Sequence, residues 1–212
     1  MTLEDNKNHW NNIYHYKQSN ELSWYEEIPF VSRFLIMKLK LRKDASIIDV
    51  GGGDSNLVDF LLKEGYTDVT VLDISEAALN RTKSRLGKQM AEKVNWLVTD
   101  ISHFKPERQY DFWHDRATFH FLTSETEVQQ YISIAHKAVK DQGHISVGTF
   151  STKGPENCSG LSIKQYNEEM LSELFNPFFE KIKCMPHVHC TPTGAEQAFI
   201  FCLFTHQIKN QP

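Results

Sequence analysis

The sequence lacks a long apolar run, a large net charge and a leader-like segment. Its 212 residues contain no stretch that approaches the ~18 consecutive apolar residues of a membrane-spanning helix. The polar start, up to Asn12, has no apolar core of the kind found in secretory signals. Lys and Arg number 23 against 27 Asp and Glu, and this mild acidity argues against a surface that coats nucleic acid. We therefore expect a cytoplasmic protein with no membrane or nucleic-acid partner.

Cysteine is scarce, and metal-binding patterns are weak. Because the N-terminal residues show no export signal, we expect free thiols in a reducing cytosol rather than disulfides. His187 and His189 beside Cys190 suggest a metal site, but the spacing matches no zinc motif. We therefore expect no metal, and we expect these residues to lie in loops that line a substrate cleft. The four cysteines all fall in the last third of the chain: Cys158, Cys184, Cys190 and Cys202.

Apolar runs alternate with helical patterns from Ala45 onward, which is typical of βαβ units. Such units place their strands in parallel, and the short turn at 191–194 then predicts an antiparallel hairpin at the end. We predict an α/β fold with a doubly wound, mostly parallel, seven-stranded Rossmann-like sheet in a single domain, 1–212. This domain comprises a helical cover (1–42), a cofactor-binding core (45–150) and a substrate-side loop, helix and hairpin (151–212). The expected strands are 45–50, 68–73, 94–100, 110–115, 144–150, 178–185 and 197–205, and the expected helices are 57–62, 76–90, 125–140 and 164–175.

A glycine loop follows the first expected strand. Gly51, Gly52 and Gly53 permit a tight turn and a close approach of the backbone to a ligand, next to the unpaired N–H groups of a helix start. Asp73 closes the second strand 20 residues after Gly53, at the spacing of an acid that accepts hydrogen bonds from ribose hydroxyls. Asp100 ends the third strand in the same way. This combination favours a nucleoside-type cofactor over purely structural turns.

One position that differs from the dinucleotide-binding glycine pattern narrows the class of cofactor. Dinucleotide-binding loops carry a third glycine where this chain has Asn56, which disfavours NAD and FAD. Asp49, just before the glycines, is positioned to fix the loop or to reach an amino group of the ligand through water.

Four segments together resemble the successive motifs of class I S-adenosylmethionine-dependent methyltransferases: 49–55 (DVGGGDS), 71–75 (VLDIS), 98–101 (VTDI) and 110–116 (YDFWHDR). The resemblance covers about 46–150. It implies S-adenosyl-L-methionine as the cofactor and S-adenosyl-L-homocysteine as the released product.

The resemblance also implies a role for each matched residue. Gly51 and Gly53 would lie against the methionine moiety. Asp73, with Ile74 beside it, would bind both ribose hydroxyls. The remaining matches would be Asp100 and Ile101 at the adenine, and Asp115 and Arg116 below the sulfonium.

Aromatic residues mark the N-terminal segment. The stretches 9–14 (HWNNIY) and 22–25 (LSWY) are similar to the small-methyltransferase branch that includes protein-lysine methylating members, in which an aromatic helix folds over the cofactor. By this resemblance Trp10, Tyr14 and Trp24 would cover the cofactor, and an aromatic face suits a sulfonium cation. The alternative, that the two tryptophans simply pack this segment onto the sheet, stays open.

Arg116 and His120 are the candidate catalytic residues. They are four apart and would share a face if a helix began at Arg116. Arg116 would orient a carboxylate substrate or Asp115, and His120 would accept a proton from the nucleophile. The alternative for His120 is a histidine that only packs in the core, which is the more frequent case.

The acceptor side of the sheet carries few acids. A lysine acceptor must lose a proton, and its site is expected to gather acids and aromatics, yet only Asp115 and Glu156 are available here. The sequence therefore favours a small-molecule acceptor, such as a carboxylate held by Arg116 or a soft thiol-like nucleophile, and a monomer or weak dimer. The alternatives are a protein (lysine) methyltransferase, a non-catalytic nucleoside-binding module and a nicotinamide oxidoreductase.

Overall fold

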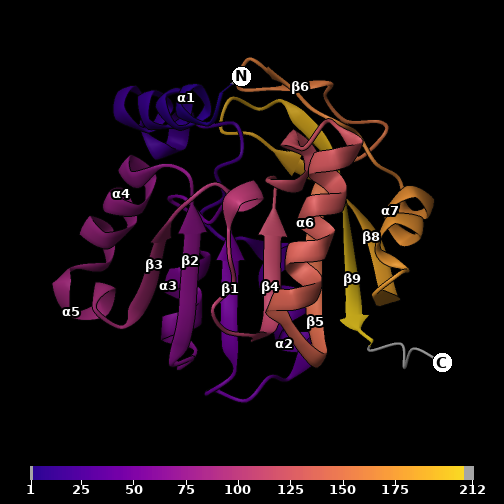
Figure 1. Cartoon of the computed structure of the whole chain (residues 1–212). Coiled ribbons are helices and arrows are strands. Elements are labelled where there is room, and N and C mark those ends of the chain that lie inside the picture. Colours follow the sequence, from indigo (N-terminus) through magenta and orange to yellow (C-terminus); the bar gives the residue numbers. More distant parts are fainter. Residues whose placement is uncertain (1, 208–212) are drawn as a thin grey trace. The chain divides into compact units, whose positions relative to one another are not determined.

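The structure is a computed structural model that describes residues 2–207. Its main sheet has seven strands in the order β3-β2-β1-β4-β5-β9-β8 (Figure 1). The strands are β1 Ser46–Val50, β2 Asp68–Asp73, β3 Val94–Val98, β4 Tyr110–Arg116, β5 Val139–Phe150, β8 Phe179–Cys190 and β9 Glu196–His206. The helices are α1 Leu3–Tyr16, α2 Phe30–Leu39, α3 Leu57–Lys63, α4 Glu76–Leu86, α5 Lys88–Ala91, α6 Glu125–Ala138 and α7 Glu168–Phe175, with short 3-10 turns η1 Ser19–Glu21, η2 Ile101–His103 and η3 Phe119–Phe121.

The predicted fold class is confirmed. β1, β2 and β3 pair in parallel, as do β4 and β5, whereas β5 and β9 are antiparallel. β8 and β9 are neighbours joined through residues 191–195 alone, a connection too short for a parallel crossover, so they form the expected hairpin. The described residues divide into two compact units, 2–104 with 190–195, and 105–189 with 196–207.

The first unit holds β1, β2 and β3. Ile47, Ile48 and Val50 have no exposed surface, because this parallel strand is buried on both faces. The register pairs Asp49 with Val71 and Asp73 with Val98, so the strand ends that carry the acids are aligned. The helix expected over 76–90 is two helices, because Gly87 adopts φ 73° and interrupts the helical path between α4 and α5.

The second unit holds β4, β5, β8 and β9. A capping box between Ser124 and Glu127 begins α6, which packs along β5 (Figure 1). The helix expected over 125–140 ends at Ala138, because β5 already starts at Val139; β5 carries a register irregularity opposite Tyr110–Phe112. β5 also runs close to β9, where any side chain at Gly148 would collide with the ring of Phe201.

Three local expectations are wrong. The helix expected at Arg116 does not form, because Arg116 ends β4 and Ala117 adopts φ 67°, outside the helical region. The loop expected over 151–161 contains two short antiparallel strands, β6 Asn157–Cys158 and β7 Leu161–Ser162, and α7 begins only at Glu168, after its N-cap Asn167. His187, His189 and Cys190 lie in β8 rather than in a loop.

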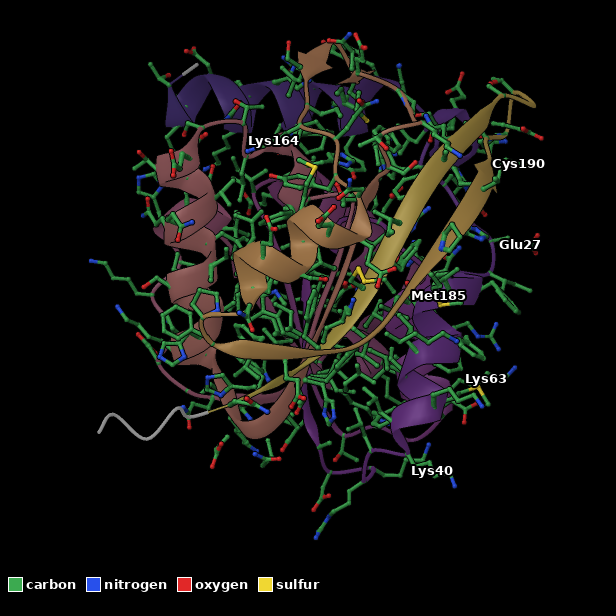
Figure 2. All side chains as sticks on the ribbon, turned by 90° about the vertical axis from the view of Figure 1, so that its right-hand side faces the viewer. Glu27, Lys40, Lys63, Lys164, Met185 and Cys190 are labelled. Carbon is green, nitrogen blue, oxygen red and sulfur yellow. A yellow bond between two sulfur atoms is a disulfide. The ribbon has the colours of Figure 1, made fainter. Side chains whose placement is uncertain are left out.

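The expectation of four free thiols is also wrong. Cys184 and Cys202 form a disulfide between β8 and β9, visible as a yellow bond in Figure 2. Adjacent strands bring the two Cα atoms to 4.1 Å, a proximity that the 18-residue sequence separation does not reveal. Cys158 is a buried free thiol and Cys190 an exposed one. Among residues 2–207, no helix is both long and apolar enough to cross a membrane.

Candidate active site

The glycine loop in the first unit is held on both sides by hydrogen bonds. The N–H groups of Gly51 and Gly52 both donate to Leu72 O, at 2.7 and 3.2 Å, and Thr82 Oγ1 donates to Gly53 O at 2.9 Å. Gly51 and Gly53 have φ values of 65° and 46°, where a side chain would be strained. A Cβ at Gly52 would approach Asp49 Oδ2 to 2.7 Å, so Asp49 closes the inner side of the loop.

Asp73 lies directly against this loop, as its spacing predicts. Its carboxylate accepts hydrogen bonds from the backbone N–H groups of Ser75, at 2.7 Å, and Gly53. Burial raises the pKa of Asp73 to about 7, and the nearby carboxyls of Asp49 and Asp54 add to this rise. The site therefore gathers three carboxyls, of which Asp54 has Arg81 Nη1 at 3.8 Å, and its buried Asp73 suits a ligand that donates hydrogen bonds.

Tyr14 reaches the same loop from α1. A Cβ placed on Gly53 would meet the Tyr14 hydroxyl at 2.7 Å and Asp73 Oδ2 at 3.2 Å, so the three groups converge. Burial raises the pKa of Tyr14 well above its usual value, and Asp73 and Asp54 contribute further. Tyr14 is thus a neutral hydroxyl at the edge of the glycine loop.

Trp10 and Trp24 surround Tyr14. Their rings meet edge-on at 5.8 Å, and Tyr14 and Trp24 meet at 6.1 Å. Both tryptophans are half-buried and pack on the core cluster of Tyr14, Leu22 and Ala78. The contacts give these tryptophans a packing role, and a role as cofactor cover stays a prediction.

The sequence reasoning missed three residues that fasten the N-terminal segment to the loop region. Asp54 accepts a hydrogen bond from Ser19 Oγ at 2.7 Å. Asn11 Oδ1 accepts from Ser75 Oγ at 2.8 Å and from the Ala77 N–H at 3.2 Å, at the start of α4. The position of Asp54, directly after the glycines, was a usable signal, whereas Asn11 carried none.

Asn56 is the third missed residue, and its role explains the absent glycine. Its Nδ2 donates to the carbonyls of Glu26 and Glu27, at 3.0 and 3.3 Å. The side chain that replaces the third glycine therefore ties the start of α3 to the residues that precede α2.

Asp100 and Ile101 lie at the end of β3. Asp100 is the N-cap of η2, and its Oδ1 accepts from the Ser102 N–H at 2.7 Å and the Ser102 hydroxyl at 2.6 Å. Ile101 is buried, and Ile74, after β2, is half-buried. These contacts fix the local backbone, and the roles at adenine and ribose stay predictions.

In the second unit, Asp115 is fully engaged by its neighbours. Its Oδ2 accepts from the Tyr131 hydroxyl at 2.7 Å, and its Oδ1 accepts from the N–H groups of Thr118 and Phe119 at 3.0 and 3.2 Å. Burial raises the pKa of Asp115 to about 6 against the lowering effect of these bonds. Asp115 thus shapes the turn that replaces the expected helix.

Arg116 and His120 lie near one another in an aromatic setting of the second unit. The Arg116 guanidinium lies 5.6 Å from the Phe199 ring centroid, and Phe199 contacts Phe150 at 4.7 Å. The His120 ring stacks on Phe150 at 4.6 Å and is fully buried. Burial lowers the pKa of His120 to about 3, and the charge of Arg116 adds to the effect. Although no helix forms, the turn still brings the two residues together.

The polar residues of the late chain do not gather into a metal site. His187 and His189 contact the rings of Phe201 and Phe199, at 6.1 and 6.2 Å. Burial raises the pKa of the Cys158 thiol. Within the part of the chain that the structure describes, no three His, Cys, Asp or Glu side chains are placed to hold a metal ion.

Comparison with known proteins finds a family match over part of the chain. Residues 48–145, which contain the glycine loop, Asp73 and Asp100, match the family described as a methyltransferase domain. The match covers 98 of the 212 residues and falls within the segment whose motifs resemble class I S-adenosylmethionine-dependent methyltransferases.

Two relatives in sequence carry different acceptors in their names. Malonyl-[acyl-carrier protein] O-methyltransferase 1 of Ilyobacter polytropus is 25% identical over 135 residues, 61% of this chain and 48% of the relative. EEF1A lysine methyltransferase 2 of Danio rerio is 23% identical over 147 residues, 69% of this chain and 59% of the relative. The chain thus spans about half the length of these curated relatives.

A solved structure supports the fold over nearly the whole chain. The Burkholderia thailandensis 1,6-didemethyltoxoflavin-N1-methyltransferase, crystallised with 1,6-didemethyltoxoflavin and S-adenosylhomocysteine, superposes with a TM-score of 0.77 at 17% identity. The alignment covers 98% of this chain and 92% of that one. At this identity the likeness concerns the fold alone.

Proposed function

We propose that this methyltransferase-family chain binds S-adenosyl-L-methionine in its first unit and transfers the methyl group to a small-molecule acceptor, releasing S-adenosyl-L-homocysteine. The observation that carries the proposal is the convergence of Gly53, Asp73 and the Tyr14 hydroxyl at the end of β1 and β2, within a region that matches the family. This cradle fits the cofactor, because the loop leaves no room for a side chain and Asp73 offers a carboxylate to ribose hydroxyls.

Each residue of the cradle would do a defined task. Asp73 would accept hydrogen bonds from the ribose diol and become fully ionised as those donors arrive. Gly51 and Gly53 would admit the methionine moiety, and Asp100 with Ile101 would border the adenine. The cofactor supplies an electrophilic methyl on a sulfonium, and the protein contributes orientation and exclusion of water.

The protein-lysine alternative rests on the similarity to the Danio rerio relative. Against it, Asp115 is the principal acid expected near the acceptor, and its oxygens already accept three hydrogen bonds within the second unit. This favours a small molecule.

Two measurements test the proposal. Calorimetry with S-adenosylmethionine and with NAD should detect binding of the former alone. Labelled S-adenosylmethionine incubated with a metabolite extract and with a protein lysate should label the small-molecule fraction. Label that appears only in protein bands would favour the lysine alternative, and binding without any transfer would indicate a nucleoside-binding module.

A further inference from the structure

The two terminal strands of the main sheet differ in composition. β8 carries Lys181, Lys183 and Pro186, which are residue types that keep an exposed strand edge from pairing with another chain. β3, at the other end of the strand order, reads VNWLV and contains neither a charged residue nor a proline. Asn95 and Val98 are exposed, the latter at 42%. The edge of β3 therefore lacks the features that prevent the addition of a further strand.

A hollow of about 440 Å³ lies beside β3 in the first unit, where α4 and α5 are next to this strand (Figure 1). Its walls come from the end of α4, from α5 and from the first half of β3, and they include Lys83, Lys88, Val94 and Trp96. The Trp96 ring is half-buried, and its Nε1 donates a hydrogen bond to Ala91 O at 2.9 Å, which fixes the ring.

The hollow is separate from the glycine loop. The loop follows the carboxyl end of β1, whereas the hollow begins at Val94, the first residue of β3. Parallel strands place their carboxyl ends at one edge of the sheet and their amino ends at the opposite edge. An occupant of the hollow would therefore not compete with a ligand at the glycine loop.

The hollow is locally positive in a chain whose net charge is −4. Lys83 Nζ lies 5.4 Å from the Trp96 ring centroid, so a cation–π contact holds this ammonium group beside an aromatic face. Within residues 2–207, neither Lys83 nor Lys88 forms an ion pair, and the walls include one acid, Glu92. Two ammonium groups against one carboxylate favour an acidic occupant, and the Trp96 ring favours an apolar group beside the acids.

We propose that the edge of β3 and the adjoining hollow form a docking groove for an extended segment of a partner protein that contains both acidic and apolar residues. The segment would add a strand to the sheet through main-chain hydrogen bonds. An apolar side chain would pack on Trp96, and neighbouring carboxylates would approach Lys83 and Lys88. A second copy of this chain fits the groove less well, because pairing β3 with itself would bring two such pairs of lysines together.

The first test offers two designed peptides of about seven residues, an ordinary strand length, to the isotope-labelled full chain. One peptide alternates valine with glutamate, and the other carries lysine in place of glutamate. Nuclear magnetic resonance follows the indole N–H of Trp96, assigned with Trp96→Phe, and the hydrogen exchange of the amides in 94–98. We expect the glutamate peptide alone to shift the indole signal and to slow the amide exchange about fivefold or more. An equal response to both peptides, or no response up to ~1 mM peptide, would overturn the proposal.

The second test separates the contribution of charge from that of the added strand. The double variant Lys83→Glu/Lys88→Glu should weaken binding of the glutamate peptide about tenfold or more. Lys38→Glu/Lys63→Glu, at exposed lysines of α2 and α3, is the matched control with the same change in net charge. A glutamate peptide with an N-methylated backbone keeps its charge but lacks main-chain donors, and it should lose most of its affinity.

Three results of these experiments would refute the docking groove. Equal losses of affinity in the two double variants would show that only the overall charge matters. Full binding of the N-methylated peptide would show that no strand is added. Protection of the β3 amides that rises with protein concentration, in the absence of any peptide, would assign the edge to a second copy of this chain. The proposed methyl transfer is independent of all three results, because the groove is separate from the glycine loop.

Discussion

Replacing Asp73 with asparagine should change folding and cofactor binding in opposite directions. The carboxyl is buried beside Asp49 and Asp54, and its pKa is raised from 3.8 to about 7. An acid with a raised folded-state pKa destabilises the fold once ionised. Stability is therefore highest below the unfolded pKa and is lost as pH rises from there through the folded pKa. The amide of the Asp73→Asn variant cannot ionise, and its oxygen can still accept from the Ser75 N–H, which donates to Asp73 Oδ1 at 2.7 Å.

The magnitude follows from the two pKa values. At about 1.4 kcal/mol per tenfold change, the ionisable carboxyl lowers the free energy of unfolding by about 2 kcal/mol at pH 5 and about 4 kcal/mol at pH 8, relative to a neutral side chain. Asp73→Asn should recover most of this amount, and more of it at the higher pH. Binding of S-adenosylmethionine should weaken by about 1.5–3 kcal/mol, because the ribose hydroxyls lose a charged acceptor.

Urea unfolding at pH 5 and pH 8 measures the first effect, and calorimetry measures the second. Asp141→Asn, at an exposed carboxyl, serves as the matched control and should alter neither quantity. If the stability of Asp73→Asn parallels that of the wild type at both pH values, the carboxyl does not carry the electrostatic penalty. If affinity for the cofactor is unchanged, Asp73 does not bind the ribose.

Three further variants or conditions test the fold around the site. Gly52→Ala should lower the free energy of unfolding, measured in urea, by about 1–3 kcal/mol, because the added methyl has no room. A variant as stable as the wild type would show that the loop can shift to accommodate a side chain. Asn11→Ala should cost about 1–2 kcal/mol by the same assay, because Ser75 Oγ and a backbone N–H lose their acceptor, and a neutral outcome would mean that water replaces it. Reduction of the Cys184–Cys202 disulfide should lower stability by about 3 kcal/mol, comparing unfolding with and without reductant, and identical curves would contradict a stabilising bond.

Much of the fold was predictable because strand and helix patterns are local. The alternation of apolar runs indicated the parallel strands, and the turn at 191–194 indicated the final hairpin. The errors arose where a backbone dihedral or a contact distant in sequence decides the outcome. The positive φ of Ala117 prevents a helix from starting directly after β4, and an alanine in the sequence does not predict a positive φ. The disulfide depends on strand pairing that only the fold reveals.

The site residues also fall into those that the sequence predicts and those that only the structure reveals. Gly51, Gly53 and Asp73 were found because their spacing along the chain has a direct physical meaning in a βαβ unit. Asn11 was missed because its partners at the start of α4 are 64 and 66 residues away. The hydrogen bond from the Phe150 N–H to His120 Nδ1 was also beyond the sequence, since the two residues are 30 positions apart.

Asn56 has a consequence for attempts to change the cofactor of this fold by design. Restoring glycine at this position, the obvious first step toward a dinucleotide site, would delete the amide that holds the carbonyls of Glu26 and Glu27. The N-terminal segment would then lose the hydrogen bonds that join Glu26 and Glu27 to the start of α3, next to the loop that the redesign changes. A redesign would first need a replacement tie for that segment, because a single side chain here both departs from the dinucleotide signature and anchors the neighbouring chain.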